Sequence, residues 1–170
     1  MRIAAAILLS ATCFFLATEC YSQDPCSTRY SPKPNEKPLT GVELAHRVLL
    51  LSPPAKWNLL TIGDVEFVLG CGTQHDADEF FAALHDKSTQ VPDAIVLEVH
   101  EDVLRVAWDD GSYPNLGELW FRFDKPLAVM PHPGDKIVIS GMYSSYSRVP
   151  LQINMTNASF VFSHPPTMEP

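Results

Sequence analysis

The feature that most constrains the fold is a pair of apolar runs in the C-terminal part of the chain. Ile137 and Ile139 alternate with other residues in the first run, and Leu151, Ile153 and Met155 do so in the second. A period of two is that of a half-buried β-strand, whose successive side chains point to opposite faces. The two runs therefore predict two strands, joined by a polar loop rich in tyrosine.

Two glycines mark where the first of these strands begins and where it bends. Gly134 and Asp135 form the expected turn into the strand, and Gly141 interrupts the strand itself. A glycine inside a strand is typical of a bulge or of a sharp bend at a barrel corner. Residues 131–162 are therefore interpreted as the closing part of a small barrel.

Three further segments with a period of two follow Val91, and turn residues separate them. Five short antiparallel strands that close on themselves remove their exposed edges. We therefore expect a five-stranded antiparallel barrel over residues 91–163. The apolar positions of the first three strands are Ile95, Leu97 and Val99; Leu104, Val106 and Trp108; and Leu119, Phe121 and Phe123.

The apolar pattern before Val91 has the period of a helix, and three threonines stand where helix N-caps are expected. These are Thr40, Thr61 and Thr73, each followed three residues later by an acidic side chain. The run VEFVL after Thr61 is also compatible with a strand. We expect a helical N-terminal region over residues 39–90, which makes the fold class α+β, with helices followed by a barrel.

The first residues have the pattern of a signal peptide. Arg2 precedes an apolar stretch at residues 3–17, which is too short for a comfortable membrane span, and small residues suited to a signal peptidase follow. We expect a signal peptide over residues 1–22, an extended lead-in over 23–38 and a disordered tail over 164–170. An uncleaved N-terminal anchor is the alternative. The mature chain is expected to be exported, periplasmic or secreted, without stable membrane insertion after cleavage.

Cleavage after residue 22 would leave two of the four cysteines, Cys26 and Cys71. Two cysteines in an oxidising compartment most simply form one disulfide. The alternative is a pair of free, buried thiols.

The chain is acidic, with 20 aspartates and glutamates against 12 lysines and arginines, a net charge of −8. Removal of the signal peptide takes away Arg2 and Glu19 and leaves this charge unchanged. An acidic excess opposes nonspecific binding to nucleic acids and to anionic membranes. Nucleic acid is therefore disfavoured as a partner.

Two motifs near the C-terminus carry a resemblance to a known family. Their positions are Gly134, Asp135, Ile137, Ile139 and Gly141, then Leu151, Ile153, Met155, Asn157 and Ala158. The chain resembles exported bacterial domains of the tRNA-anticodon-binding-like OB family, many of them uncharacterised, over residues 91–163. The resemblance implies an OB-like barrel, and its motifs are structural. Residues 124–133 depart from it, because three prolines exclude the helix that commonly plugs such a barrel. Either the N-terminal helices cover that end or the barrel is only partly closed.

In OB folds, the face of the second and third strands and the adjacent loops form the usual binding groove. Aromatic side chains interleaved with arginines can stack on bases, sugars or peptide side chains. The first hypothesis is therefore an exported, non-enzymatic module without a cofactor, which binds an envelope protein, a peptide or a glycan. The alternative is that Trp120 packs beneath a helix or the lead-in. The predicted binding residues are Arg105, Trp120 and Arg122 on the strands and Tyr143, Tyr146 and Arg148 on the loop before the last strand.

A second hypothesis, of a different class, is a metal-dependent hydrolase. His75, Asp78 and Glu79 form the densest cluster of possible metal ligands, and His75 and Glu79 share one face of a helix. Acidic residues in the first turns of a helix also stabilise its dipole without any metal. The sequence contains no other recognisable catalytic motif.

Overall fold

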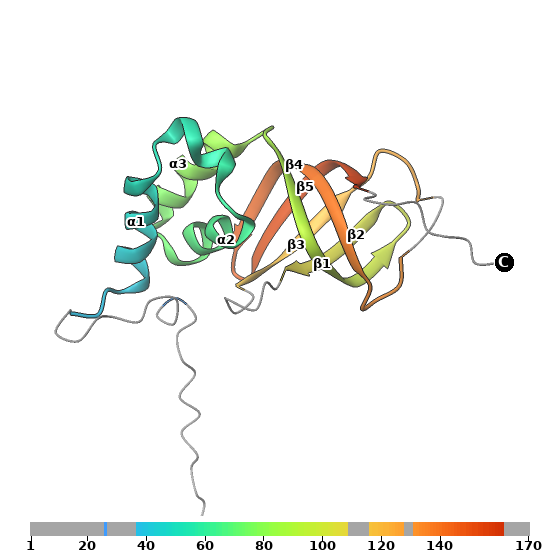
Figure 1. Cartoon of the computed structure of the whole chain (residues 1–170), viewed down its shortest axis with the longest axis horizontal. Helices are drawn as coiled ribbons and strands as arrows, with labels where there is room; N and C mark the ends of the chain where they lie inside the picture. Colours follow the sequence, from blue (N-terminus) through green and yellow to red (C-terminus); the bar gives the residue numbers. More distant parts are fainter. Residues whose placement is uncertain (1–25, 27–36, 109–115, 128–130, 162–170) are drawn as a thin grey trace, which may run out of the picture.

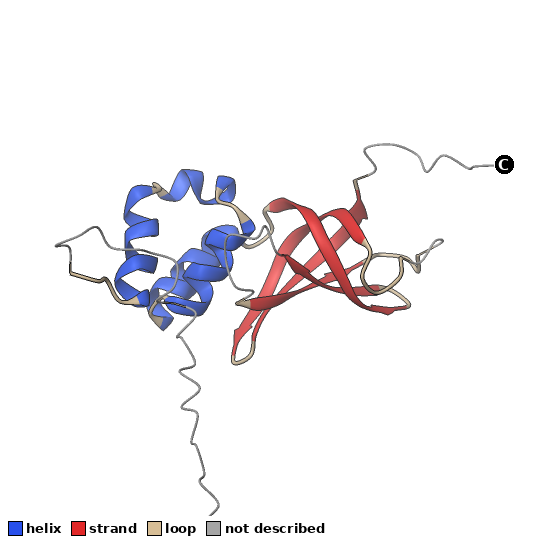
Figure 2. Cartoon of the chain, turned by 60° about the horizontal axis from the view of Figure 1, so that its bottom comes forward, coloured by secondary structure: helices blue, strands red, loops and turns tan. Residues whose placement is uncertain are grey.

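The computed structural model describes residue 26 and residues 37–108, 116–127 and 131–161. Helices form one unit and strands form a barrel beside it (Figure 1, Figure 2). The predicted signal peptide (1–22) and disordered tail (164–170), and most of the lead-in (23–38), lie outside the described residues. In chain order the elements are α1 (Gly41–Leu51), the 3₁₀ helix η1 (Pro54–Leu59), α2 (Ile62–Cys71), α3 (Gln74–Leu84), β1 (Ser88–His100), β2 (Val103–Trp108), β3 (Gly117–Arg122), β4 (Lys136–Arg148) and β5 (Leu151–Phe160).

The three α-helices begin at the three threonines that the sequence indicates. Thr40 and Thr61 each form a capping box with the acidic residue three positions later, and the Thr73 hydroxyl accepts from the backbone of Asp76. These contacts satisfy backbone N–H groups that a helix start leaves without partners. The helical interpretation of the run after Thr61 is thereby confirmed. In the part of the chain that is described, no helix has the length and apolar character needed to cross a membrane.

Trp57 anchors η1, an element that the sequence pattern did not predict. Prolines after Ser52 end α1, and η1 turns the Trp57 ring into the interior of the helical unit. The indole N–H donates to the Ser52 carbonyl at 2.6 Å, and the ring meets Phe80 edge-on at 5.2 Å.

The five strands close into a barrel in the order β1-β2-β3-β5-β4. The prediction of an all-antiparallel barrel is wrong, because β3 and β5 run parallel. A closed ring with an odd number of strands cannot alternate direction throughout, so at least one neighbouring pair must be parallel. The pairs β1-β2, β2-β3, β4-β5 and β1-β4 are antiparallel, and the β3-β5 pair is parallel. The topology is compatible with an OB-like fold.

The apolar face predicted for β1 is wrong at Ile95 and Leu97 and right at Val99, which packs against the core. Ala94 and Val96 point into the core, whereas Leu97 is 36% exposed. The pairing of β1 with β2 shifts between Val96 and Glu98, and a bulge of this kind exchanges the two faces of a strand. The predicted inward faces of β2 and β3 are confirmed, since Leu104, Val106, Trp108, Leu119, Phe121 and Phe123 all belong to the core.

β4 is longer than predicted and takes up residues expected to form a loop. It runs to Arg148, pairing first with β1 and then with β5. The register shifts twice against β5, between Ser140 and Met142 and between Tyr143 and Ser145. These two bulges break the period of two, so the second half of the strand does not resemble one in sequence.

One hydrophobic core runs from the helical unit into the barrel. Val68 and Leu69 of α2 and Phe81 of α3 belong to the same buried cluster as Ile139 and Ile153 of the barrel. The barrel is closed, and the helices extend its core at one end (Figure 2). Neither alternative raised by the prolines in residues 124–133 holds. The barrel is closed, but the helices lie at the end where Arg148 of β4 contacts α2, whereas Leu127 lies at the opposite end, beside the β1–β2 turn.

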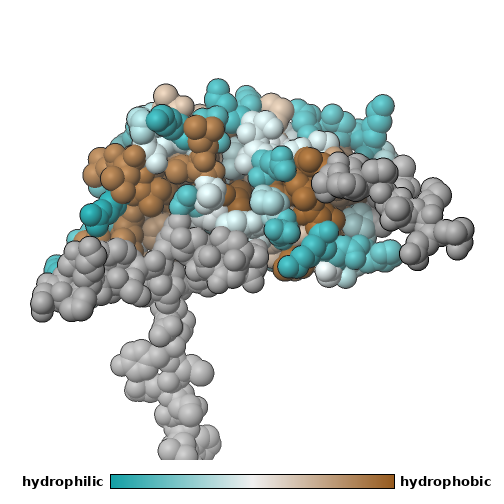
Figure 3. All heavy atoms as spheres, viewed as in Figure 1, coloured by the Kyte–Doolittle hydropathy of each residue, from teal (hydrophilic) through white to brown (hydrophobic). Residues whose placement is uncertain are grey.

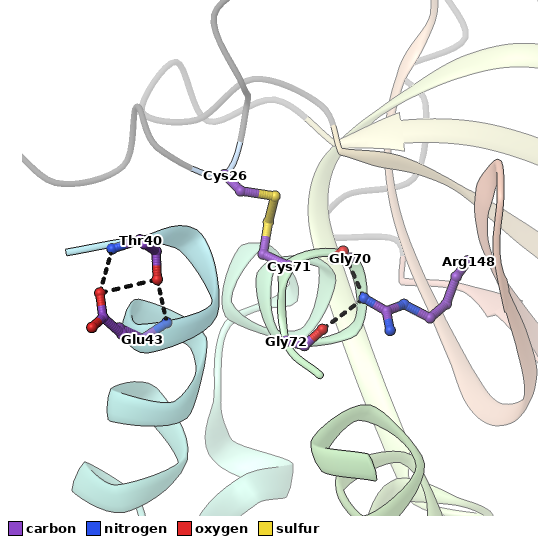
Figure 4. Close-up of a disulfide and its surroundings, with 7 residues drawn as sticks. All are labelled: Cys26, Thr40, Glu43, Gly70, Cys71, Gly72 and Arg148. Carbon is purple, nitrogen blue, oxygen red and sulfur yellow. Dashed lines mark hydrogen bonds between the residues drawn. A yellow bond between two sulfur atoms is a disulfide. The ribbon is translucent and has the colours of Figure 1, made fainter. Parts of the chain in front are cut away.

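The predicted disulfide is confirmed between Cys26 and Cys71, with Cα atoms 5.6 Å apart (Figure 4). It ties the segment before α1 to the last residue of α2. Gly41 lies directly beneath it, and a Cβ atom at that position would collide with the Cβ atom of Cys26. The first residue of α1 is therefore glycine because the bridge passes over it.

Candidate functional site

Arg105, Trp120 and Arg122 share the outer face of β2 and β3. Leu119 and Phe121 are fully buried, so the strand turns Trp120 outward between them, where it is half-buried. Arg105 is the cross-strand partner of Trp120. The structure therefore brings these three predicted binding residues together.

Both arginines on this face are paired with acidic side chains. The Arg105 Nη1 atom lies 3.0 Å from Glu98, and the Arg122 Nη1 atom lies 2.8 Å from Asp102. The Trp120 indole N–H points to Glu118 at 3.4 Å. The positive charge of the face is locally balanced, so it is not a strongly basic patch.

A surface hollow of about 260 Å³ lies beside Trp120 on the wall formed by β2, β3, β4 and β5. Trp120 and Arg122 line it from β3, Asn154 and Thr156 from β5, Ser145 from β4 and Val103 from β2. Trp120 pairs with Asn154 across the parallel β3–β5 contact, so this closure of the barrel positions the two sides of the hollow.

The bulge in β4 places two consecutive serines, Ser144 and Ser145, on the lining of this hollow. A regular strand would turn one of them away. The Ser144 hydroxyl donates to the Asn154 carbonyl at 3.0 Å. The Gln152 amide donates to the Asn154 side-chain oxygen at 2.7 Å, and the Asn154 amide donates to Ser145 Oγ at 2.9 Å. The alternation of side chains along β4 could not predict this group of polar side chains, because the group depends on where the bulge lies.

Tyr143 does not belong to this surface. It lies in β4 rather than in a loop, is 2% exposed and meets Phe81 edge-on at 6.3 Å. Burial raises the pKa of its hydroxyl to about 12. Its position in the core indicates a structural role.

Tyr146 joins the barrel to the helical unit. Its ring lies 4.8 Å from that of Phe81, and its hydroxyl donates to Asp78 at 2.5 Å. The hydrogen bond from Tyr146, followed by one from Gln74, lowers the pKa of the Asp78 carboxyl. Burial and the contact with Asp78 raise the pKa of Tyr146 to about 12.

Arg148 binds the end of α2 from the barrel side (Figure 4). Its Nη2 atom donates to the carbonyls of Gly70 at 3.0 Å and of Gly72 at 2.7 Å. A cation at a helix C-terminus satisfies carbonyls that have no partner within the helix and complements the helix dipole. Tyr146 and Arg148 were predicted beside Trp120, but they hold the two parts of the fold together instead.

The possible metal ligands on α3 do not converge. The Oε2 atom of Glu79 lies 3.9 Å from Nε2 of His75, and both side chains are largely exposed. The Asp78 carboxylate accepts a hydrogen bond from the Tyr146 hydroxyl. Within residues 37–108, 116–127 and 131–161, no group of three or more His, Cys, Asp or Glu side chains is arranged to hold a metal ion.

Glu66 is the residue with the most unusual environment, and sequence reasoning missed it. It lies on α2, is 2% exposed, and accepts a hydrogen bond from the backbone of Leu116. Its Oε1 atom is buried without a hydrogen-bond partner among the described atoms. Burial raises the pKa of the carboxyl to about 8, because desolvation penalises the charged form. In the sequence, the sign of this buried carboxyl is that Glu66 is an acidic residue inside the apolar run VEFVL.

Large apolar side chains reach the surface on the helical unit. Leu50 and Leu59 are each 73% exposed, and Leu51 is 77% exposed. Figure 3 shows apolar residues at the surface over the helical part of that face. This surface differs in chemistry from the polar hollow on the barrel wall.

Comparison of this chain with protein-family models, with curated proteins and with solved structures finds no match.

Proposed function

We propose that this chain is an exported, non-enzymatic binding module, an OB-like barrel with a helical cap, that works through the hollow beside Trp120. The observation that carries the proposal is the combination of an outward tryptophan with preorganised amide and hydroxyl groups in one surface hollow. Binding sites of small ligands combine apolar or aromatic walls with a few placed polar groups in this way.

Three features support the rest of the proposal. The disulfide between Cys26 and Cys71 is typical of proteins in an oxidising compartment, which agrees with the signal peptide expected at residues 1–22. The strand order is compatible with an OB-like barrel, the fold of the tRNA-anticodon-binding-like OB family that the sequence motifs resemble. The charge of −8 favours a peptide, glycan or envelope protein over nucleic acid as the ligand.

Titration of the purified chain with a panel of peptides and glycans tests this function. The panel is repeated with Trp120→Ala and with Ser147→Ala, because Ser147 is exposed on β4 and outside the hollow. We expect at least one class to bind the wild type and the Ser147 variant equally and the Trp120 variant at least about tenfold more weakly. Equal binding by all three proteins, or binding by none, would refute the proposal.

Export is tested separately by the intact mass of the protein recovered outside the cytoplasm. We expect a chain that begins near Gln23. A full-length mass in the membrane fraction would support the uncleaved anchor.

A further inference from the structure

We infer that the hollow beside Trp120 accepts one ring of a neutral carbohydrate. This inference rests on the binding function proposed above and names the ligand class of that site.

The indole of Trp120 supplies the apolar wall that such a ligand requires. One face of a pyranose ring presents C–H groups, and an aromatic side chain offers a large, rigid, apolar surface for them at little cost in side-chain entropy. The polar edge of the indole is already satisfied, since its N–H points to Glu118. The ring face of Trp120 is therefore the part that remains to contact a ligand.

The polar side of the hollow carries neutral groups that match sugar hydroxyls. Ser145 Oγ accepts from Asn154, so its own proton can be donated to a ligand oxygen. Asn154 in turn is held by Gln152, which fixes the direction of this chain of hydrogen bonds. Thr156 belongs to the same lining, and a threonine hydroxyl can both donate and accept. A polyhydroxylated ligand needs both hydrogen-bond donors and hydrogen-bond acceptors from the protein.

The charges around the hollow favour a neutral ligand over an anionic one. Arg122 lines the hollow, but its Nη1 atom is engaged by Asp102 at 2.8 Å. A phosphate or carboxylate that approached Arg122 would also meet the carboxylates of Asp102, which holds Nη1, and of Glu118, which accepts from the neighbouring indole. A guanidinium has five N–H donors, so the paired Arg122 can still donate to a neutral hydroxyl.

The size of the hollow limits the ligand to one ring within it. Its volume of about 260 Å³ lies just below the roughly 300–1,000 Å³ typical of pockets for drug-sized ligands. A longer glycan would therefore place one residue in the hollow and extend across the barrel surface.

The test follows the indole N–H signals by NMR during titration with cellobiose, maltose and N,N′-diacetylchitobiose at millimolar concentrations. The chain has three tryptophans, and Trp57 and Trp108 are buried in the core, so only one of three signals should move. Trp120→Phe assigns that signal by deleting it. Glucose 6-phosphate and a tetraproline peptide serve as the anionic and peptide comparisons.

We expect at least one neutral sugar to shift the Trp120 signal and to bind more tightly than glucose 6-phosphate. Ser145→Ala should weaken binding about three- to tenfold, because one hydrogen bond is lost, and Ser147→Ala should leave it unchanged. Absence of a shift with every sugar, or tighter binding of the phosphate, would overturn the inference. If the peptide alone moves the Trp120 signal, the carbohydrate assignment fails while the binding function stands; if no probe in the wider panel binds, both fail.

Discussion

Glu66 makes the stability of this fold depend on pH in the opposite direction to most carboxyl groups. Burial raises its pKa from an ordinary 4.5 to about 8. Between these two values the unfolded chain has released the Glu66 proton, whereas the folded chain still holds it. The stability associated with neutral Glu66 is complete below pH 4.5, falls as the pH rises, and is lost once the pH passes 8.

The size of the effect follows from the interval between the two pKa values, which is 8 − 4.5 = 3.5. Each pKa unit corresponds to about 1.36 kcal/mol, so stability falls by at most about 5 kcal/mol over this range. A typical domain is stable by about 5–15 kcal/mol, so this fall is large. Structural relaxation around a charged Glu66 lowers it, and we expect about 3–5 kcal/mol.

Urea denaturation of the wild type and of Glu66→Gln, from about pH 4 to about pH 9, isolates this contribution. Glutamine has a similar shape but does not ionise, so the difference between the two proteins cancels the titration of every other group. Oε1 of Glu66 has no hydrogen-bond partner among the described atoms, so placing an amide N–H₂ there changes the stability by an offset that does not vary with pH. The variant should gain stability relative to the wild type as the pH rises from 5 to 8. A difference that stays constant across this range would refute the reasoning.

Three further variants test the packing of the fold. Gly141→Val should cost about 1–3 kcal/mol of unfolding free energy, because a Cβ atom there would lie 3.0 Å from the ring of Phe121; a melting temperature equal to that of the wild type would contradict the barrel register. Replacing both Cys26 and Cys71 by serine should cost about 4 kcal/mol in the chain-entropy model, and two alkylatable thiols in the non-reduced protein would show that the bridge is absent. Arg148→Met keeps the aliphatic stem but removes two hydrogen bonds to carbonyls at the end of α2, so it should cost about 1–3 kcal/mol and speed amide exchange in α2; unchanged exchange would contradict the capping role.

The local chemistry of the helices and of two strands could be predicted from the sequence. The caps at Thr40, Thr61 and Thr73 depend on residues three positions apart, and such short-range contacts form wherever the helix forms. The inward faces of β2 and β3 follow from a period of two, because no bulge interrupts the pairing of these two strands. The disulfide could be predicted because only two cysteines follow the expected cleavage site.

Bulges and long-range closure account for the errors in the strands. A bulge after Val96 exchanges the faces of β1, and two more make the end of β4 resemble a loop. The position of a bulge depends on the partner strand, which periodicity within one segment does not reveal. The parallel pairing of β3 with β5 is likewise a property of the ring and not of either strand.

The candidate site was predicted only in its β2–β3 half. Trp120 and its neighbouring arginines are fixed by alternation, so they could be placed on the outer face. Tyr146 and Arg148 have the same residue types, but their partners are Asp78 and the end of α2, about 70 positions earlier in the chain. Composition cannot distinguish an aromatic side chain that binds a ligand from one that joins two parts of a fold.

The central claim is that Trp120 forms the wall of a surface hollow and does not belong to the core. The most direct measurement compares the unfolding free energies of Trp120→Ala and Leu119→Ala by urea denaturation. Leu119 points into the barrel and is fully buried, so its substitution should cost roughly 2–5 kcal/mol. Trp120→Ala should cost no more than about 1 kcal/mol, the scale of a cross-strand contact. A loss of roughly 3–5 kcal/mol for Trp120→Ala, as expected for a buried tryptophan, would contradict the account.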